Sequence, residues 1–111
     1  MQRSSAKAKG KTLERFIVAR IKEAFNFEDD DIRTAIGSEN GLDIKITRRS
    51  AAKFPFGIEC KNRETFTSIY NHYSQAATNS DGLIPLVVIK MNRQKPLAIL
   101  DFEHFLTLVS K

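Results

Sequence analysis

The sequence predicts a single α/β domain with a central mixed sheet of about four strands. Helical patterns at 12–25 and 66–78 alternate with short apolar runs whose side chains follow the two-residue period of a strand. The 111 residues suffice for one domain with one core, and the hydrophobic fraction of 41% favours folding over disorder. The expected order of elements is α-β-β-α-β-β-α.

The first helix is expected at 12–25, after a mobile basic arm at 1–10, so that residues 11–111 form the domain. At 100° per residue the apolar side chains of this helix fall on one arc, namely Leu13, Phe16, Ile17, Val18, Ile21, Ala24 and Phe25. Glu14 falls inside the arc. An acid there either reaches solvent and complements the helix dipole or points into a site beside the core, and periodicity leaves both interpretations open.

A polar connection is expected at 26–40. Its acidic cluster at 28–31 is interpreted as a solvated loop, because an unbroken run of carboxylates cannot supply calcium ligands at alternate positions. Residues 32–36 form a short strand or an extended segment, and a turn-rich loop follows at 37–41.

Two neighbouring strands are expected at 42–47 and 54–61, joined by a basic hairpin connection at 48–53. In the first strand Leu42, Ile44 and Ile46 share one face, with Asp43, Lys45 and Thr47 on the other. In the second, Phe56, Ile58 and Cys60 share one face, with Glu59 and Lys61 opposite. A buried carboxylate and ammonium on one strand are costly unless something uses them.

The second helix is expected at 66–78, with Thr65 as its N-cap. Tyr70 and Tyr73 fall on its apolar face. Tyrosines at helical spacing are more simply core residues than platforms for base stacking, so the core interpretation is favoured.

The C-terminal part is expected to add two strands and a helix. The Val- and Ile-rich run at 83–91 predicts a buried strand, and 97–100 predicts a further one. Asp101 is the expected cap of a final helix that ends at Val109. The apolar side chains of that helix either pack in the core, the simpler view, or help to bury an interface.

Charge and cysteine usage narrow the functional classes. The net charge of +5 and the isoelectric point of about 9.6 favour a polyanionic partner, most simply nucleic acid. No run is long or apolar enough to cross a membrane, and the N-terminus lacks the apolar segment of a secretory signal. The single cysteine, Cys60, excludes an intramolecular disulfide and fits a reducing cytoplasm.

Asp43, Glu59 and Lys61 form the constellation that predicts chemistry. Phosphodiester hydrolysis needs an activated water and neutralised phosphoryl charge, which divalent cations held by carboxylates supply. Asp43 and Glu59, on neighbouring strands, could chelate one Mg²⁺ together with the main-chain carbonyl of Cys60. Lys61 could orient the attacking hydroxide or neutralise developing charge, and the oxygen ligands favour Mg²⁺ or Mn²⁺ over zinc. The simpler alternative is a structural ion pair between Glu59 and Lys61.

These residues resemble a known motif. Glu14, Asp43 and the run Ile58-Glu59-Cys60-Lys61 are similar to the PD-(D/E)XK nuclease superfamily, most of all to the small Holliday junction resolvases of archaea and phages. A Gly-x-x-x-Glu sequence opens the first helix here as Gly10 to Glu14. The resemblance covers nearly the whole chain, although Leu42 stands where many members have proline.

The resemblance implies a restriction-endonuclease-like core in which Asp43 and Glu59 bind Mg²⁺, Lys61 is catalytic and Glu14 assists. Mn²⁺ is expected to substitute for Mg²⁺. Two further site candidates rest on the resemblance alone, namely Gln75 on the second helix and Ser38 in the loop before Asp43.

The expected function is that of a Mg²⁺-dependent, structure-selective DNA endonuclease in recombination or repair. It would be a Holliday junction resolvase that makes symmetric cuts as a homodimer, in the cytoplasm of a bacterial or archaeal cell or encoded by a phage. The expected phosphate contacts are the basic residues of the arm and of the hairpin connection, namely Lys7, Lys9, Lys11, Arg48, Arg49 and Lys53. The alternatives are a nicking, repair or restriction-like nuclease of other DNA specificity and a non-catalytic DNA-binding module.

Overall fold

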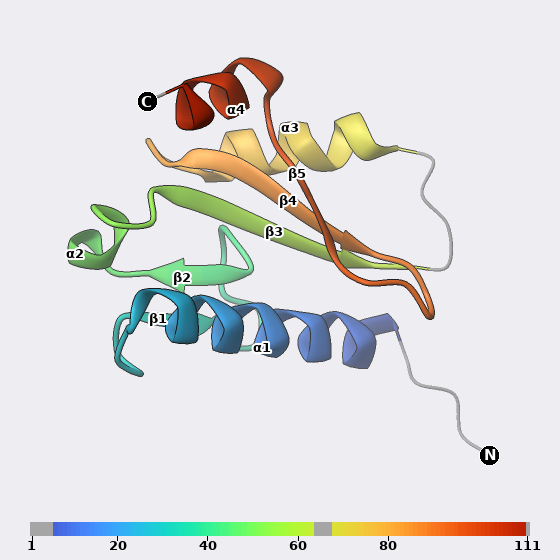
Figure 1. The fold of residues 1–111 in the computed structure, drawn as a ribbon. Helices are drawn as coiled ribbons and strands as arrows, with labels where there is room; N and C mark the ends of the chain where they lie inside the picture. The colour runs from blue at the N-terminus through green and yellow to red at the C-terminus, as the bar shows by residue number, and fades with distance from the viewer. Residues whose placement is uncertain (1–5, 64–67, 111) are drawn as a thin grey trace.

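The structure is a computed structural model that describes residues 6–63 and 68–110. The elements in chain order are α1 Ala6–Phe25, β1 Ile32–Thr34, β2 Ile44–Ile46, α2 Arg48–Ala51, β3 Phe56–Asn62, α3 Ile69–Asn79, β4 Ile84–Lys90, β5 Leu97–Ile99 and α4 Phe102–Val109. The predicted α/β class is confirmed. In Figure 1, α1 runs below β2, β3 and β4, and α3 and α4 lie above them.

Within the described residues the strands form two sheets. The larger is mixed, with the order β3-β4-β5, in which β3 and β4 are parallel and β4 and β5 antiparallel. The smaller is the antiparallel pair β1-β2, with Ile32 opposite Ile46. The prediction of a mixed sheet is confirmed, whereas the prediction of about four strands in it differs from the three observed.

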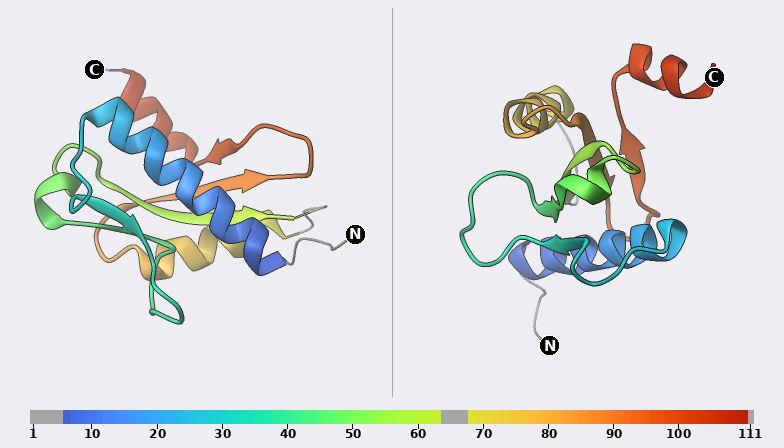
Figure 2. Two further views of the ribbon diagram at one scale, coloured as in Figure 1. Left: turned by 90° about the horizontal axis from the view of Figure 1, so that it is seen from below. Right: turned by 90° about the vertical axis from the view of Figure 1, so that its left-hand side faces the viewer.

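Strand β3 is covered on both faces, which positions its polar residues. Its even-numbered face, with Ile58 and Cys60, packs into the core against the buried α1 residues Leu13 and Val18. Its odd-numbered face, which begins at Gly57, receives the C-terminal end of α3. The two views of Figure 2 show the same arrangement, with α1 and α3 on opposite sides of β3 and β4.

Helix α1 begins at Ala6 and not at residue 12, so residues 6–10 of the predicted mobile arm are helical. The alanines and lysines of this segment are good helix formers, and the segment is tied down: the Lys9 ammonium donates to Asn92 Oδ1 at 3.1 Å. Leu13, Val18 and Ile21 are buried as expected, but Phe16 is 50% exposed. Among the described helices, none combines the length and the apolar character that a membrane crossing requires.

The predicted hairpin between residues 47 and 54 is wrong. The connection contains the short helix α2, because the Thr47 hydroxyl accepts a hydrogen bond from Ser50 N at 3.1 Å and caps it. Strand β2 pairs with β1 and not with β3. Asp31 was predicted to be part of a solvated loop, but it is buried and its carboxylate accepts from Glu28 N at 2.7 Å.

Helix α3 begins at Ile69, and the predicted cap Thr65 lies outside the described residues. Tyr70 is 88% exposed, so the prediction that it is a core residue is wrong, while Tyr73 is half-buried. The helix is short and turns only a narrow stripe toward the sheet, of which Ala76 is fully buried.

Helix α4 stands apart from the core. Asp101 caps it as predicted, since its Oδ1 accepts a hydrogen bond from His104 N at 3.1 Å. Every residue of the helix is exposed, so the simpler prediction of core packing is wrong. The exposed apolar side chains are Phe102, Phe105, Leu106, Leu108 and Val109.

Candidate functional site

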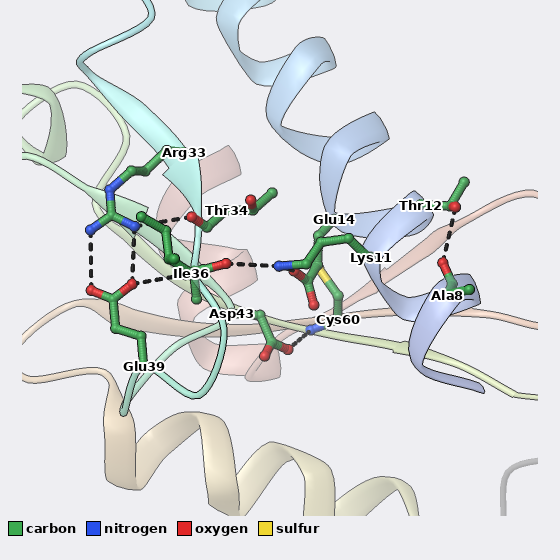
Figure 3. A network of polar contacts seen from close by, with 11 residues as sticks. Ala8, Lys11, Thr12, Glu14, Arg33, Thr34, Ile36, Glu39, Asp43 and Cys60 are labelled. Carbon is green, nitrogen blue, oxygen red and sulfur yellow. Dashed lines mark hydrogen bonds and ion pairs between the residues drawn. The ribbon is translucent and has the colours of Figure 1, made fainter. Parts of the chain in front are cut away.

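The site is built at the outer edge of β3. Main-chain hydrogen bonds run from Ile84 N to Pro55 O and from Arg63 N to Lys90 O. They show that the main-chain N–H and C=O groups of the odd-numbered residues in this stretch point toward β4. The N–H and C=O of Cys60 therefore point to the other edge, because both groups of one strand residue point the same way. Asp43, immediately before β2, meets Cys60 there: its Oδ2 accepts from Cys60 N at 2.9 Å (Figure 3).

Glu59 is the buried carboxylate of the site. It is 2% exposed, and its Oε1 finds no hydrogen-bond partner among the residues that the structure describes. Burial and then the negative charge of Asp43 raise the pKa of Glu59 to about 7, against smaller lowering effects of Lys61 and Asn79. The two carboxylates repel each other when both are ionised, so a bound cation would stabilise their charged forms.

Glu14 points toward this pair rather than to solvent. Its side chain is 13% exposed, and burial followed by the charge of Asp43 raises its pKa. The Lys11 ammonium lies 3.2 Å from Glu14 Oε1 and donates to Ala35 O at 2.7 Å. Figure 3 shows Lys11 extending from α1 between Glu14 and the chain after β1. The Glu14 carboxylate thus lies beside Asp43 rather than in solvent, and its role in a site stays a prediction.

A cavity of about 570 Å³ opens beside Glu14 and Asp43. Its lining includes Lys9, Lys11, Glu14, Asp43, Cys60, Lys61, Asn62 and Arg63. Among the ion pairs of the described residues there is none between Glu59 and Lys61, which counts against the simpler structural alternative. The cavity thus combines a carboxylate cluster with a basic rim.

Asn62, Arg63 and Asn79 were not identified as site residues from the sequence. The Oδ1 of Asn62 is buried without a hydrogen-bond partner among the described residues, while its Nδ2 donates to Lys9 O at 3.4 Å. Extending the alternation of β3 by one step beyond Lys61 would have placed Asn62 on the face of Cys60. No sequence signal indicates Asn79.

Several predicted DNA contacts lie elsewhere. Arg49 belongs to α2, where its Nη2 lies 3.2 Å from Asp31 Oδ1, and with Lys53 it lines a separate hollow of about 330 Å³. Arg48 lines a groove beside β2. Ser38 and Gln75 are exposed and, within the described part of the chain, do not line the cavity. The side chain of Lys7 lies outside the described residues.

The donor set fits a hard divalent cation only in part. No group of three or more His, Cys, Asp or Glu side chains that could hold a metal occurs in the described residues. The pair Asp43 and Glu59 does offer the unpartnered Oε1, and the Cys60 carbonyl faces the same edge. Mg²⁺ commonly binds through one or two carboxylates and keeps several waters, so this oxygen set suits it. The Cys60 thiol is buried, and burial raises its pKa. The thiol therefore stays protonated and does not compete with the oxygen ligands for the metal.

No protein-family model, curated protein or solved structure matches this chain.

Proposed function

We propose that the protein is a Mg²⁺-dependent DNA endonuclease of the PD-(D/E)XK type with a restriction-endonuclease-like core. One observation carries the proposal: the buried Glu59, whose Oε1 has no hydrogen-bond partner among the described residues, lies beside Asp43, and Asp43 lines a cavity that Lys9, Lys11 and Arg63 also line. A further support is the element order α1-β1-β2-α2-β3-α3-β4, which matches the α-β-β-α-β order of that superfamily once β1 and the short helix α2 are left out.

Asp43, Glu59 and the Cys60 carbonyl would hold the metal, which supplies a nucleophilic water and neutralises charge on the phosphate. The chain's own residues do the rest. Lys61, which lines the cavity together with Asp43, balances the negative charge that develops on the phosphoryl oxygens. The water oxygen bonds to phosphorus and the P–O3′ bond breaks, so the products carry 5′-phosphate and 3′-hydroxyl ends.

Glu14 and Lys11 position the site from α1. Their ion pair, together with the bond from Lys11 to Ala35 O, ties α1 to the segment that leads to Asp43. Lys9, Lys11 and Arg63 at the rim are the cations best placed to meet the DNA backbone. Arg48, Arg49 and Lys53 would contact only DNA that extends beyond the cavity.

We propose a four-way DNA junction as the substrate, cut by a homodimer in a reducing cytoplasm. One chain carries one site, and resolving a junction needs two symmetric incisions. The uncovered apolar face of α4, with Phe102 and Phe105, is the surface we assign to the second copy. Other superfamily nucleases and a non-catalytic DNA-binding module are the competing functions.

The deciding experiment compares four-way, flapped and linear duplex DNA of equal length, each with Mg²⁺ and with EDTA. Paired incision of the four-way junction by the wild type, absent from Glu59→Gln, supports the resolvase. Equal cutting of linear duplex would indicate a nuclease of other specificity. DNA binding without any cleavage in Mg²⁺ or Mn²⁺ would leave only the binding module.

A further inference from the structure

The C-terminal end of α3 contacts β3 directly, and only glycine permits this. A Cβ on Gly57 would lie 2.6 Å from Ser80 Oγ and 2.9 Å from Leu42 Cδ1, both too close. Ser80 is buried and its hydroxyl donates to Ala76 O at 2.5 Å, which fixes it to the helix. The last turn of α3 is therefore held at a defined position against the strand.

The contact between Gly57 and Ser80 also positions Asn79. It is the last residue of α3 and precedes Ser80. Glu59 follows Gly57 by two residues, so the two share a face of β3, and the residue beside Ser80 comes to lie beside Glu59. The amide of Asn79 is a hydrogen-bonding neighbour of the Glu59 carboxylate and lowers its pKa.

We propose that Asn79 is a positioning residue: it holds one oxygen of Glu59 so that Oε1 remains directed to the cation and Asp43. The inference rests on the proposed metal site and extends it to a residue on α3. An amide suits the task because its N–H₂ donates without adding charge, whereas a third carboxylate would repel the pair.

The groove on the far side of Asn79 strengthens the argument. It has a volume of about 360 Å³ and is lined by Asn79, Ser80, Leu42 and Lys45, among others. Asn79 thus stands between this groove and the buried carboxylate. Without its side chain, water from the groove would reach Glu59 and compete for the oxygen that now accepts from the amide.

The test measures Mn²⁺ binding by titration calorimetry on the complete chain without DNA. Asn79→Ala removes the amide, and Asn79→Leu removes it while keeping its volume. Glu59→Ala reports on the metal site itself, and Asn71→Ala, an exposed asparagine on the same helix, is the matched control. Loss of an outer partner of a ligand typically weakens metal binding by about 10-fold or more. We expect that loss in both Asn79 variants, wild-type affinity in Asn71→Ala, and near-absent binding in Glu59→Ala.

The outcomes separate the two proposals. If Glu59→Ala loses Mn²⁺ while both Asn79 variants bind it like the wild type, the role of Asn79 is refuted and the metal site stands. If the wild type binds no Mn²⁺, the metal site and the role of Asn79 both fall. If circular dichroism finds both Asn79 variants unfolded, the residue is structural and the positioning role is likewise overturned.

Discussion

Asp43 Oδ2 lies 2.9 Å from the main-chain nitrogen of Cys60, so one carboxylate joins the segment before β2 to the edge of β3. Asp43 therefore has two separable functions, as hydrogen-bond acceptor and as negative charge. Asn keeps an acceptor oxygen but no charge, and Ala keeps neither. The two substitutions can distinguish the structural bond from the proposed chemistry.

We expect Asp43→Ala to be less stable than Asp43→Asn by about 1–3 kcal/mol, because Ala leaves the Cys60 N–H without its acceptor. Both variants should lose Mg²⁺-dependent cleavage, since both lose the charge. Urea unfolding of the metal-free proteins and a cleavage assay measure the two effects. Equal stability of the variants would contradict the role of the bond, and cleavage by Asp43→Asn would contradict the metal role.

The stability of the metal-free protein should fall as pH rises from 5 to 8. The folded state raises the pKa of Glu59 to about 7 from an ordinary value of 4.5, so between these values it binds more protons than the unfolded chain. A state that binds more protons is favoured at low pH, and the difference is on the order of 3 kcal/mol. Urea unfolding in EDTA at several pH values measures the slope. Glu59→Gln should flatten it, and an unchanged slope in that variant would contradict the assignment.

Lys61→Met should reduce cleavage by about 10²–10³-fold while Mn²⁺ still binds, because the substitution removes a charge at the phosphate and no metal ligand. Lys95→Met, an exposed lysine in the turn before β5, is the matched control and should cleave normally. Single-turnover cleavage at saturating metal gives the rates. A Lys61→Met protein as active as the control would remove Lys61 from the chemistry.

Gly57→Ala should destabilise the fold by about 1–3 kcal/mol, since its Cβ would overlap Ser80 Oγ at 2.6 Å. Removing that hydroxyl in the double variant Gly57→Ala with Ser80→Ala should restore part of the lost stability. Denaturant unfolding of both single variants and the double variant gives the coupling. Strict additivity of the two changes would show that the contact is not the cause.

The wild type should be a dimer, and the double substitution Phe102→Ser with Phe105→Ser should convert it to a monomer. The stability of the fold should not change, because these rings are 67% and 45% exposed. Tyr70→Ser is the control, since Tyr70 is also exposed, at 88%, but lies on α3. Sedimentation velocity measures the mass. A monomeric wild type would refute the interface on α4.

The alternation of β3 predicted much of the site. A two-residue period places Glu59 away from Ile58 and Cys60 without any tertiary information, and the core residues Leu13 and Val18 follow from helical periodicity. The pairing of β2 with β1 could not be predicted, because the two-residue period of 42–47 states which side chains share a face and not which strand lies beside it. The helix α2, capped by the bond from Ser50 N to Thr47, was not predicted either. Asn79 could not be predicted either, since its place follows from a contact between Gly57 and Ser80 that are distant in sequence.

Helical periodicity also predicted burial wrongly where, within the described residues, no other element covers the apolar face of a helix. Tyr70 and the rings of α4 lie at helical spacing, yet they are exposed. A pattern states which side chains share a face, and the packing of the neighbouring elements decides whether that face is covered.

The bond between Asp43 and Cys60 also bears on solubility. The edge of β3 that carries it would otherwise offer a free main-chain donor to a strand of another molecule, the route by which exposed sheet edges begin to aggregate. A charged side chain seated on that donor blocks the approach. The carboxylate assigned to the metal thereby also protects the chain from intermolecular strand pairing.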